Sequence, residues 1–279
     1  MLKLKTGASY AIGFSIPFLF VFLTFIIYPL LISLELLATN TEYYSMLFSD
    51  KLYNQALINT AIFIGVGVPI KLTLALLLSG FLTYYSKIKI VKVLNVLYLL
   101  PWAIPAISAA LSFRWTLNYD YGILNMFLAD MGFNRVRWLL DYPTAMMSVI
   151  VFHIWKWLPM WTMLLLAGRK GIPEELYESA SIDGASVFQR FTGITAPLLS
   201  KLFFICLLLS SIWSMGEFEA VWLVTMAGPN QSTHIITTLG YKFTFFDVNI
   251  VKGLAAYMSL LPAVLILVFV LIRLTRETK

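Results

Sequence analysis

Two apolar segments of the chain each carry polar and aromatic side chains on one predicted helix face. The first segment, 143–168, has the spacing i, i+3, i+4, i+7 in the set His153, Lys156, Trp157 and Met160. The second segment, 198–227, has the set Trp213, Ser214 and Glu217. Polar groups within apolar helices tend to face a bundle interior or a cavity. Aromatic planes can pack on the C–H groups of a ligand while serine, glutamate and histidine bond its hydroxyls, so the two faces predict a binding site.

The charges on these faces allow other interpretations. Lys156 and Glu217 could neutralise each other across the bundle as a structural ion pair, and the tryptophans could be packing residues only. Lys156 would equally suit a charged ligand such as a uronate or a phosphorylated glycerol. Glu219 lies two residues beyond Glu217 and cannot share its helix face. Lys71 and Arg114 are predicted to be structural or snorkelling groups.

The sequence lacks the residue patterns that common catalytic and metal chemistries need. No Gly-x-x-x-x-Gly-Lys-Ser/Thr motif occurs, so the chain has no P-loop for ATP phosphates. His153 and His234 are far apart in sequence, and the single cysteine, Cys206, lies in an apolar run. We therefore predict no catalytic residue, no metal site and no cofactor bound by this chain, which is not an enzyme by itself.

Composition places the two helix faces in a membrane. Of 279 residues, 60% are hydrophobic and 12% are charged, against roughly 25% charged in ordinary soluble domains. Six apolar stretches are long enough to cross a hydrocarbon core about 30 Å thick. They cover approximately residues 10–37, 57–83, 91–113, 143–168, 198–227 and 251–274. The fold class predicted is all-α, a polytopic membrane protein with one transmembrane domain over residues 1–279.

Loop charges predict the orientation of this domain. An even number of spans places both termini on one side of the membrane. That side also receives the 84–92 loop and the 169–201 segment, and together they carry 12 of the 20 Lys and Arg residues. Because basic residues are enriched in cytoplasmic loops, both termini are predicted to be cytoplasmic. The basic residues form no continuous stripe, so nucleic acid is not an expected partner.

The cytoplasmic segment 172–197 is the most strongly patterned polar stretch. Pro173 suits a first helical turn, and the helix that it begins should end near Ile182. Gly184 can supply the positive φ that a helix ending requires, and a second helix then leads to Pro197. Small residues surround the bend, which leaves room for another protein to approach closely.

These residues resemble the EAA loop of ABC importer permeases. The matching residues are Glu178-Ser179-Ala180, Asp183-Gly184-Ala185, Ile194 and Pro197. Alanine is usual where this chain has Ser179. Further motifs resemble the sugar-transporting branch typified by the maltose permease subunit. In chain order they are Asn59-Thr60, Leu100-Pro-Trp-Ala-Ile-Pro105, Gly122-Ile-Leu-Asn125, Ala167-Gly168, Ile172-Pro173 and Thr225-Met-Ala-Gly-Pro229, with Ala227 where glycine is usual.

The resemblance implies a type I importer permease in the cytoplasmic membrane of a prokaryote. Its partners would be a second permease subunit in a heterodimer, two ATPase subunits that carry ATP and Mg, and an extracytoplasmic solute-binding protein. It implies that an ATPase contacts Leu176, Tyr177, Glu178, Ala180, Asp183, Gly184 and Ala185. It also places the two helix faces near the sugar site of maltose-type permeases, so the solute predicted is a sugar or oligosaccharide.

Three alternatives remain open at this point. The chain could be an ABC permease for a peptide, a glycerol phosphate or a uronate. It could be an ion-coupled secondary transporter, although no convincing internal repeat of the kind typical of that class occurs. A membrane scaffold or enzyme would leave the two helix faces unexplained.

Overall fold

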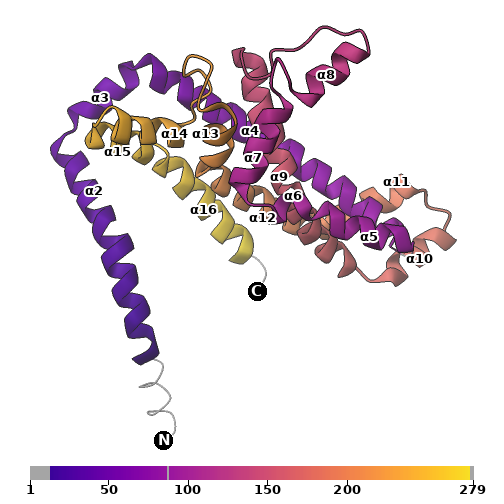
Figure 1. Cartoon of the computed structure of the whole chain (residues 1–279). Coiled ribbons are helices and arrows are strands. Elements are labelled where there is room, and N and C mark those ends of the chain that lie inside the picture. Colours follow the sequence, from indigo (N-terminus) through magenta and orange to yellow (C-terminus); the bar gives the residue numbers. More distant parts are fainter. Residues whose placement is uncertain (1–12, 87, 277–279) are drawn as a thin grey trace, which may run out of the picture.

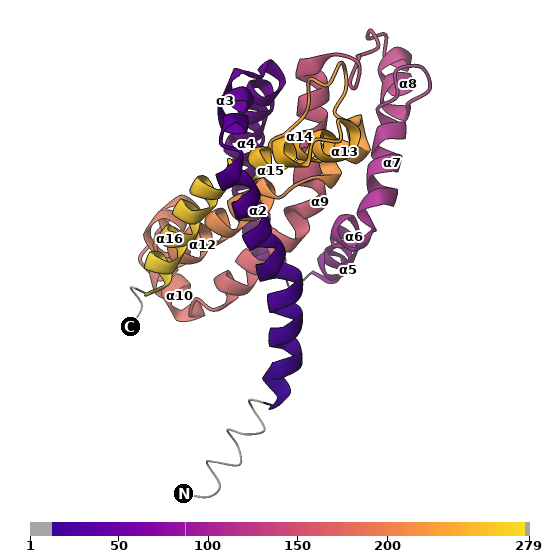
Figure 2. The same ribbon diagram turned by 90° about the vertical axis from the view of Figure 1, so that its left-hand side faces the viewer.

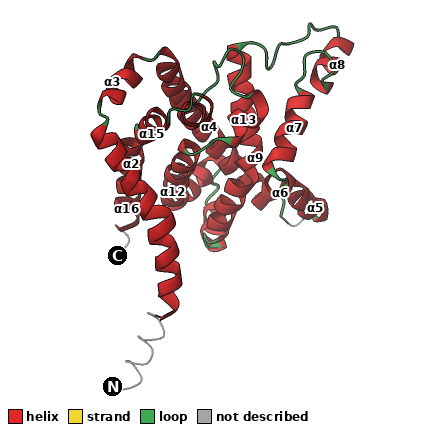
Figure 3. Ribbon diagram, turned by 60° about the vertical axis from the view of Figure 1, so that its left-hand side comes forward, coloured by secondary structure: helices red, strands yellow, loops and turns green. Residues whose placement is uncertain are grey.

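The computed structural model describes residues 13–86 and 88–276, and these residues form helices and loops without a β-strand (Figure 3). The helices are α2 (Tyr28–Thr39), α3 (Glu42–Ser49), α4 (Lys51–Tyr84), α5 (Lys89–Tyr98), α6 (Leu100–Ala103), α7 (Ala106–Thr116), α8 (Ile123–Asp130), α9 (Tyr142–Lys170), α10 (Glu174–Ile182), α11 (Val187–Arg190), α12 (Ala196–Met215), α13 (Glu219–Thr225), α14 (Ile236–Tyr241), α15 (Ile250–Met258) and α16 (Leu261–Arg276). Three π-helical turns are η1 (Leu23–Ile27), η2 (Phe191–Thr195) and η3 (Lys242–Phe246). Among the described residues, five helices are long and apolar enough to span a membrane, or six if one bent pair counts as a span. The predicted all-α, multi-span fold class is confirmed.

The first span stands apart from the other helices. It runs without a break over Gly13–Thr39, and its most apolar 18-residue window contains no buried side chain. Figure 1 shows its α2 portion extending away from the bundle. The apolar side chains of this span therefore find little cover within the described chain. Residues 10–12 of the predicted first span lie outside the described residues.

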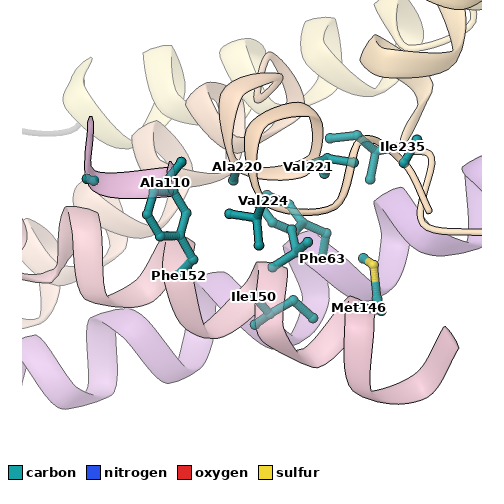
Figure 4. Packing of buried hydrophobic residues seen from close by; sticks show 12 residues of the cluster. Phe63, Ala110, Met146, Ile150, Phe152, Ala220, Val221, Val224 and Ile235 are labelled. Atoms are coloured by element: carbon teal, nitrogen blue, oxygen red, sulfur yellow. The ribbon is translucent and has the colours of Figure 1, made fainter. Parts of the chain in front are cut away.

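The core of the bundle is the pair α4 and α9. Phe63 of α4 packs with Val149 and Phe152 of α9, and Ala110 of α7 and Val221 of α13 complete the same cluster (Figure 4). A second cluster places Leu72 of α4 beside Trp161 of α9. Burial of such side chains stabilises the fold by about 1.5–3 kcal/mol each as an upper estimate. The two long helices thus form the frame on which shorter elements are placed.

The Asn59-Thr60 motif fastens a distant loop to this frame. The Asn59 Nδ2 donates to the carbonyl oxygens of Ser232 at 2.7 Å and His234 at 2.8 Å. The Tyr142 hydroxyl of α9 donates to Asn59 Oδ1 at 2.7 Å, and Thr60 Oγ1 accepts from the Ile236 N–H at 3.0 Å. Because buried backbone groups need partners, these bonds fix the loop before α14 against α4 and α9.

The third span is broken, whereas the sequence predicted one continuous stretch at 91–113. Its halves, Lys89–Ala103 and Ala106–Thr116, meet at an angle of 95°. Ile104 is extended, with ψ of 135°, and Pro105 follows it. Proline lacks an N–H and disfavours helical backbone in the residue before it. The motif Leu100–Pro105, which looked like part of a span, is the joint between two half-spans.

The predicted fifth span, 198–227, also differs from the structure. The helix begins earlier, since Val187–Met215 forms one 29-residue helix that includes Pro197. It ends at Met215, where Gly216 forms the C-cap, and the short helix α13 follows after a turn. Glycine has low helix propensity, which favours the end of the helix here. The carboxylate of Glu217, in the same turn, bonds to residues outside α12, as described below.

The bundle has two distinct ends. In Figure 2, α3 and α8 lie at the upper end, whereas α10, the start of α2 and the end of α16 lie toward the lower end. The described ends of the first and last spans are thus on the same side as α10. The cytoplasmic identity of that side remains a prediction from the loop charges.

An ion pair at the start of α4 gives the fold a predictable acid sensitivity. Asp50 Oδ2 lies 2.7 Å from Lys252 Nζ, and Asp50 Oδ1 caps α4 by accepting from the Leu52 N–H. Burial acts to raise the pKa of Asp50, but the bonds from Lys252, Leu52 and Tyr53 together hold the pKa below its usual value. The stability that this carboxylate contributes is therefore present at neutral pH and lost as the pH falls through its folded-state pKa.

Two variants separate the ion pair from the cap. Asp50→Asn removes the charge and keeps a good N-cap residue, so we expect a loss below about 1 kcal/mol and a weaker acid dependence of unfolding. Asp50→Ala removes the cap as well and should cost about 1 kcal/mol more. Thermal unfolding of the purified chain at a series of acidic pH values measures both. An unchanged acid dependence in Asp50→Asn would contradict the assignment.

Candidate functional site: a cavity beside the fourth and fifth spans

A cavity of about 400 Å³ lies between α4, α9 and the end of α12. Its lining combines ionisable, hydroxyl and aromatic side chains. They belong to Lys71, His153, Trp157, Trp161, Ser210, Ile212, Trp213, Ser214, Gly216 and Glu217. A volume of a few hundred Å³ with a few polar groups among apolar ones is typical of small-molecule sites.

Three ionisable side chains form a continuous network at this cavity. Lys71 Nζ of α4 lies 2.8 Å from His153 Nε2 of α9, and His153 Nδ1 lies 2.9 Å from Glu217 Oε2. An ammonium group can only donate, so Nε2 accepts and Nδ1 carries the hydrogen that Glu217 receives. The Ser214 hydroxyl lies 3.2 Å from His153 Nε2. The network joins α4, α9 and the turn after α12.

Glu217 also shapes the turn in which it lies. Its Oε1 accepts from the Ala220 N–H at 3.0 Å, which is the first turn of α13. Its backbone carbonyl accepts from the Thr237 hydroxyl of α14. Both carboxylate oxygens are therefore engaged by the protein, and the charge of Glu217 offsets the buried charge of Lys71 through His153.

Three tryptophans give the cavity an aromatic wall. Trp157 and Trp161 come from successive turns of α9, and the Trp161 and Trp213 rings lie 5.6 Å apart at 50°. Trp161 is buried, whereas the Trp213 side chain is 54% exposed. A half-exposed indole beside hydrogen-bonding groups can pack on the apolar face of a polar ligand.

The structure brings together five of the seven residues predicted to bind solute. They are His153, Trp157, Trp213, Ser214 and Glu217. Met160 and Lys156 lie outside the cavity lining, because the lining face of α9 follows positions 153, 157 and 161. Sequence reasoning missed Trp161 and Ser210, and it assigned Lys71 a structural or snorkelling role outside the predicted site. Treating every charged residue within an apolar span as a candidate would have added Lys71 to the predicted set.

Lys156 has a different set of partners. The ion pair considered between Lys156 and Glu217 is not formed, because Lys156 Nζ donates to the carbonyl oxygens of Pro101 at 2.8 Å and Trp102 at 3.2 Å. It also donates to the Ile104 carbonyl. All three acceptors belong to the break in the third span.

The segment 172–197 forms the first helix and the bend that its sequence predicts, and its second helix continues into the fifth span. Helix α10 ends at Ile182, as expected, and Gly184 has φ of +76°. The Ala185 N–H donates to the Ala180 carbonyl at 2.9 Å and the Gly184 N–H to the Ser181 carbonyl at 3.1 Å. These two bonds define a Schellman ending. Ser186 and Gln189 then form a capping box at the start of α11.

The bend between α10 and α11 presents apolar side chains outward. The exposed set is Leu176, Ile182, Val187 and Phe188, with Ile182 86% exposed. Glu178, Asp183 and Gly184 are exposed, while Ala180 and Ala185 are partly covered. The Tyr177 hydroxyl turns inward, 2.9 Å from Thr195 Oγ1, and so braces α10 against the start of the fifth span. Sequence reasoning missed Ile182, Val187 and Phe188, which stand out as apolar residues in a polar segment.

An all-helical chain with several membrane spans and a polar, aromatic cavity among them has the architecture of a solute permease. The chain belongs to the family of binding-protein-dependent transport system inner membrane components, whose profile matches residues 56–275. It is therefore a permease subunit of an ABC importer, and the predicted family resemblance is confirmed. An ion-coupled secondary transporter is excluded by this membership.

Two similar proteins carry names from the transport of sugars or their derivatives. The trehalose/maltose transport system permease protein MalF of Thermococcus litoralis is 36% identical over 207 residues, covering 74% of this chain and 69% of the relative. The sulfoquinovosyl glycerol transport system permease protein SmoG of Agrobacterium fabrum is 29% identical, covering 85% and 77%. A chain of a bacterial alginate ABC transporter superposes with a TM-score of 0.88 at 22% identity, covering 99% and 97%. That last similarity shows the ABC permease fold.

Proposed function

We propose that this chain forms half of the pathway by which a binding-protein-dependent ABC importer moves a sugar or oligosaccharide across a prokaryotic cytoplasmic membrane. The observation that carries the proposal is the cavity at α9 and α12, where three tryptophans stand beside hydrogen-bonding groups. The sugar names of the relatives support the same solute class. Both termini and α10 would face the cytoplasm.

The exposed bend of α10 supports a role in coupling to ATP hydrolysis. Its apolar side chains need a partner, and the chain has no P-loop of its own. We assign that partner as an ATPase subunit, which would bind ATP and Mg. A second permease subunit, a second ATPase subunit and an extracytoplasmic solute-binding protein would complete the importer.

Trp213→Ala tests the solute site. Removing this half-exposed indole should lower sugar uptake about tenfold, because an aromatic contact with a ligand contributes roughly 1–2 kcal/mol. The loss should be greatest at low solute concentration, and radiolabelled uptake into cells or proteoliposomes measures it. Trp115→Ala in α7 is the matched control, since Trp115 is also half-exposed and lies outside the cavity lining. Equal uptake by the two variants would refute the site.

A charged sugar derivative is a second candidate solute. Lys71 is a buried cation in the cavity lining, and one relative is named for transport of sulfoquinovosyl glycerol. Competition of uptake by neutral maltodextrins and by a uronate oligosaccharide distinguishes the two classes. Competition by the uronate alone would favour the charged solute.

A further inference from the structure

The break in the third span leaves backbone carbonyl groups without their helical donors. In a continuous helix, the carbonyl of Pro101 would accept from the N–H of residue 105, but that residue is proline. The extended backbone of Ile104, with ψ of 135°, removes the next donors by turning the chain away. Unpaired carbonyl groups are strongly unfavourable within a membrane unless another group donates a hydrogen bond to them.

Lys156 supplies the missing donors. Its ammonium group has three N–H bonds, and it donates to the carbonyl oxygens of Pro101, Trp102 and Ile104. The side chain is only 5% exposed, so water does not compete freely for these bonds. A cation is also favoured at the carbonyl end of a helix by the helix dipole.

The two half-spans differ in their packing. Helix α6 packs on α9, whereas α7 packs on α13 and also meets α9 at the Phe113 and Phe152 rings, whose centroids lie 5.3 Å apart. Lys156 belongs to α9 and lies at the joint between the halves, so its bonds tie the joint to α9. The same helix α9 ends at Lys170, and only three residues separate it from α10. A displacement of α9 therefore carries the Lys156 ammonium group with it.

We propose that Lys156 is a positioning residue that sets the bend of the third span and connects this bend to movement of α9. This proposal depends on the proposed function in one respect, namely that an ATPase subunit moves α10 and thereby α9. The lysine is thus neither a solute ligand nor the partner of Glu217. It holds the angle between the two half-spans by donating the hydrogen bonds that backbone N–H groups would donate in a continuous helix.

Distances between spin labels test the bend directly. Labels at exposed Val96 of α5 and Leu111 of α7, in a Cys206→Ala background, report the separation of the half-spans. In the membrane-reconstituted full chain we expect one narrow distance distribution. Lys156→Met should broaden or shift it, and Lys156→Arg should restore it because guanidinium can still donate to the carbonyls. Lys51→Met, at the exposed start of α4, is the control and should change nothing. An unchanged distribution in Lys156→Met overturns the proposal.

The connection to transport is tested in the assembled importer. Lys156→Met should leave the ATPase subunit bound while uptake falls about tenfold, as expected for loss of a coupling contribution, and Lys156→Arg should recover uptake. Normal uptake in Lys156→Met would refute the connection. Absence of a copurifying ATPase from the unmodified chain would instead refute the proposed function and leave the distance experiment valid.

A further variant covers the case in which Lys156→Met does not fold. Pro105→Ala restores a backbone N–H in reach of the Pro101 carbonyl and permits helical backbone at Ile104. The double variant Pro105→Ala/Lys156→Met should therefore yield folded protein, seen as a single symmetric peak in size-exclusion chromatography. A double variant as poorly folded as Lys156→Met would contradict the donor-replacement role.

Discussion

Replacing Gly184 by valine is expected to reduce ATP-driven uptake by about tenfold or more while the chain still inserts in the membrane. Gly184 has φ of +76°, and a Cβ atom there would meet nothing within 4 Å. The cost is therefore backbone strain, about 1–2 kcal/mol for any L-residue in this region and more for a β-branched one. The strain would open the Schellman ending and change the angle between α10 and α11. Uptake and ATP hydrolysis, measured on the same preparation, should become uncoupled.

Gly132 provides a matched control. It has φ of +82°, and a Cβ there would likewise meet nothing within 4 Å, but it lies just after α8, far along the chain from α10. Gly132→Val should carry similar backbone strain and leave coupling intact. If both valine variants lose uptake equally, the effect belongs to general stability. If Gly184→Val transports normally, the α10 bend has no role in coupling.

The segment 172–197 was the part of the chain most predictable from sequence, because its signals are local. Pro173, Asp183 and Gly184 each act within a turn of their own position, so the helix ending near Ile182 followed from conformational preferences alone. The contact between Tyr177 and Thr195 spans 18 residues and has no such local signal.

The cavity was predictable only in part, since its lining depends on helix rotation and on helices distant in sequence. Positions 153 and 157 lie on the lining face of α9. The predicted set also included 156 and 160, which lie on the neighbouring face, because the i, i+3, i+4, i+7 spacing covers residues of both faces. Lys71 joins His153 across 82 residues, a pairing that no spacing rule reveals. The break at Pro105 was visible as a motif, but its 95° bend depends on the donors that Lys156 supplies.

Neutralising Glu217 should destabilise the chain, and removing Lys71 at the same time should recover much of the loss. Glu217→Gln keeps one oxygen, which can accept from the His153 or the Ala220 N–H group but not from both, and it removes the charge that offsets buried Lys71. Leaving one charge of a buried pair uncompensated costs on the order of 3 kcal/mol. Lys71→Met alone should cost a similar amount, because the Glu217 charge is then uncompensated. Thermal unfolding of the detergent-solubilised chain measures all the variants.

The double variant Lys71→Met/Glu217→Gln decides between charge compensation and simple packing. If compensation is the reason for the network, the double variant should be more stable than either single variant, since no buried charge remains. If each side chain acts only through its own packing, the two losses should add. Glu219→Gln is the control, because Glu219 is exposed and its loss should stay within about 0.5 kcal/mol. If Lys71 and Glu217 neutralise each other, the cavity lining has no net charge, as suits a neutral sugar. Sugar uptake measured for the same three variants therefore also tests whether the solute is neutral.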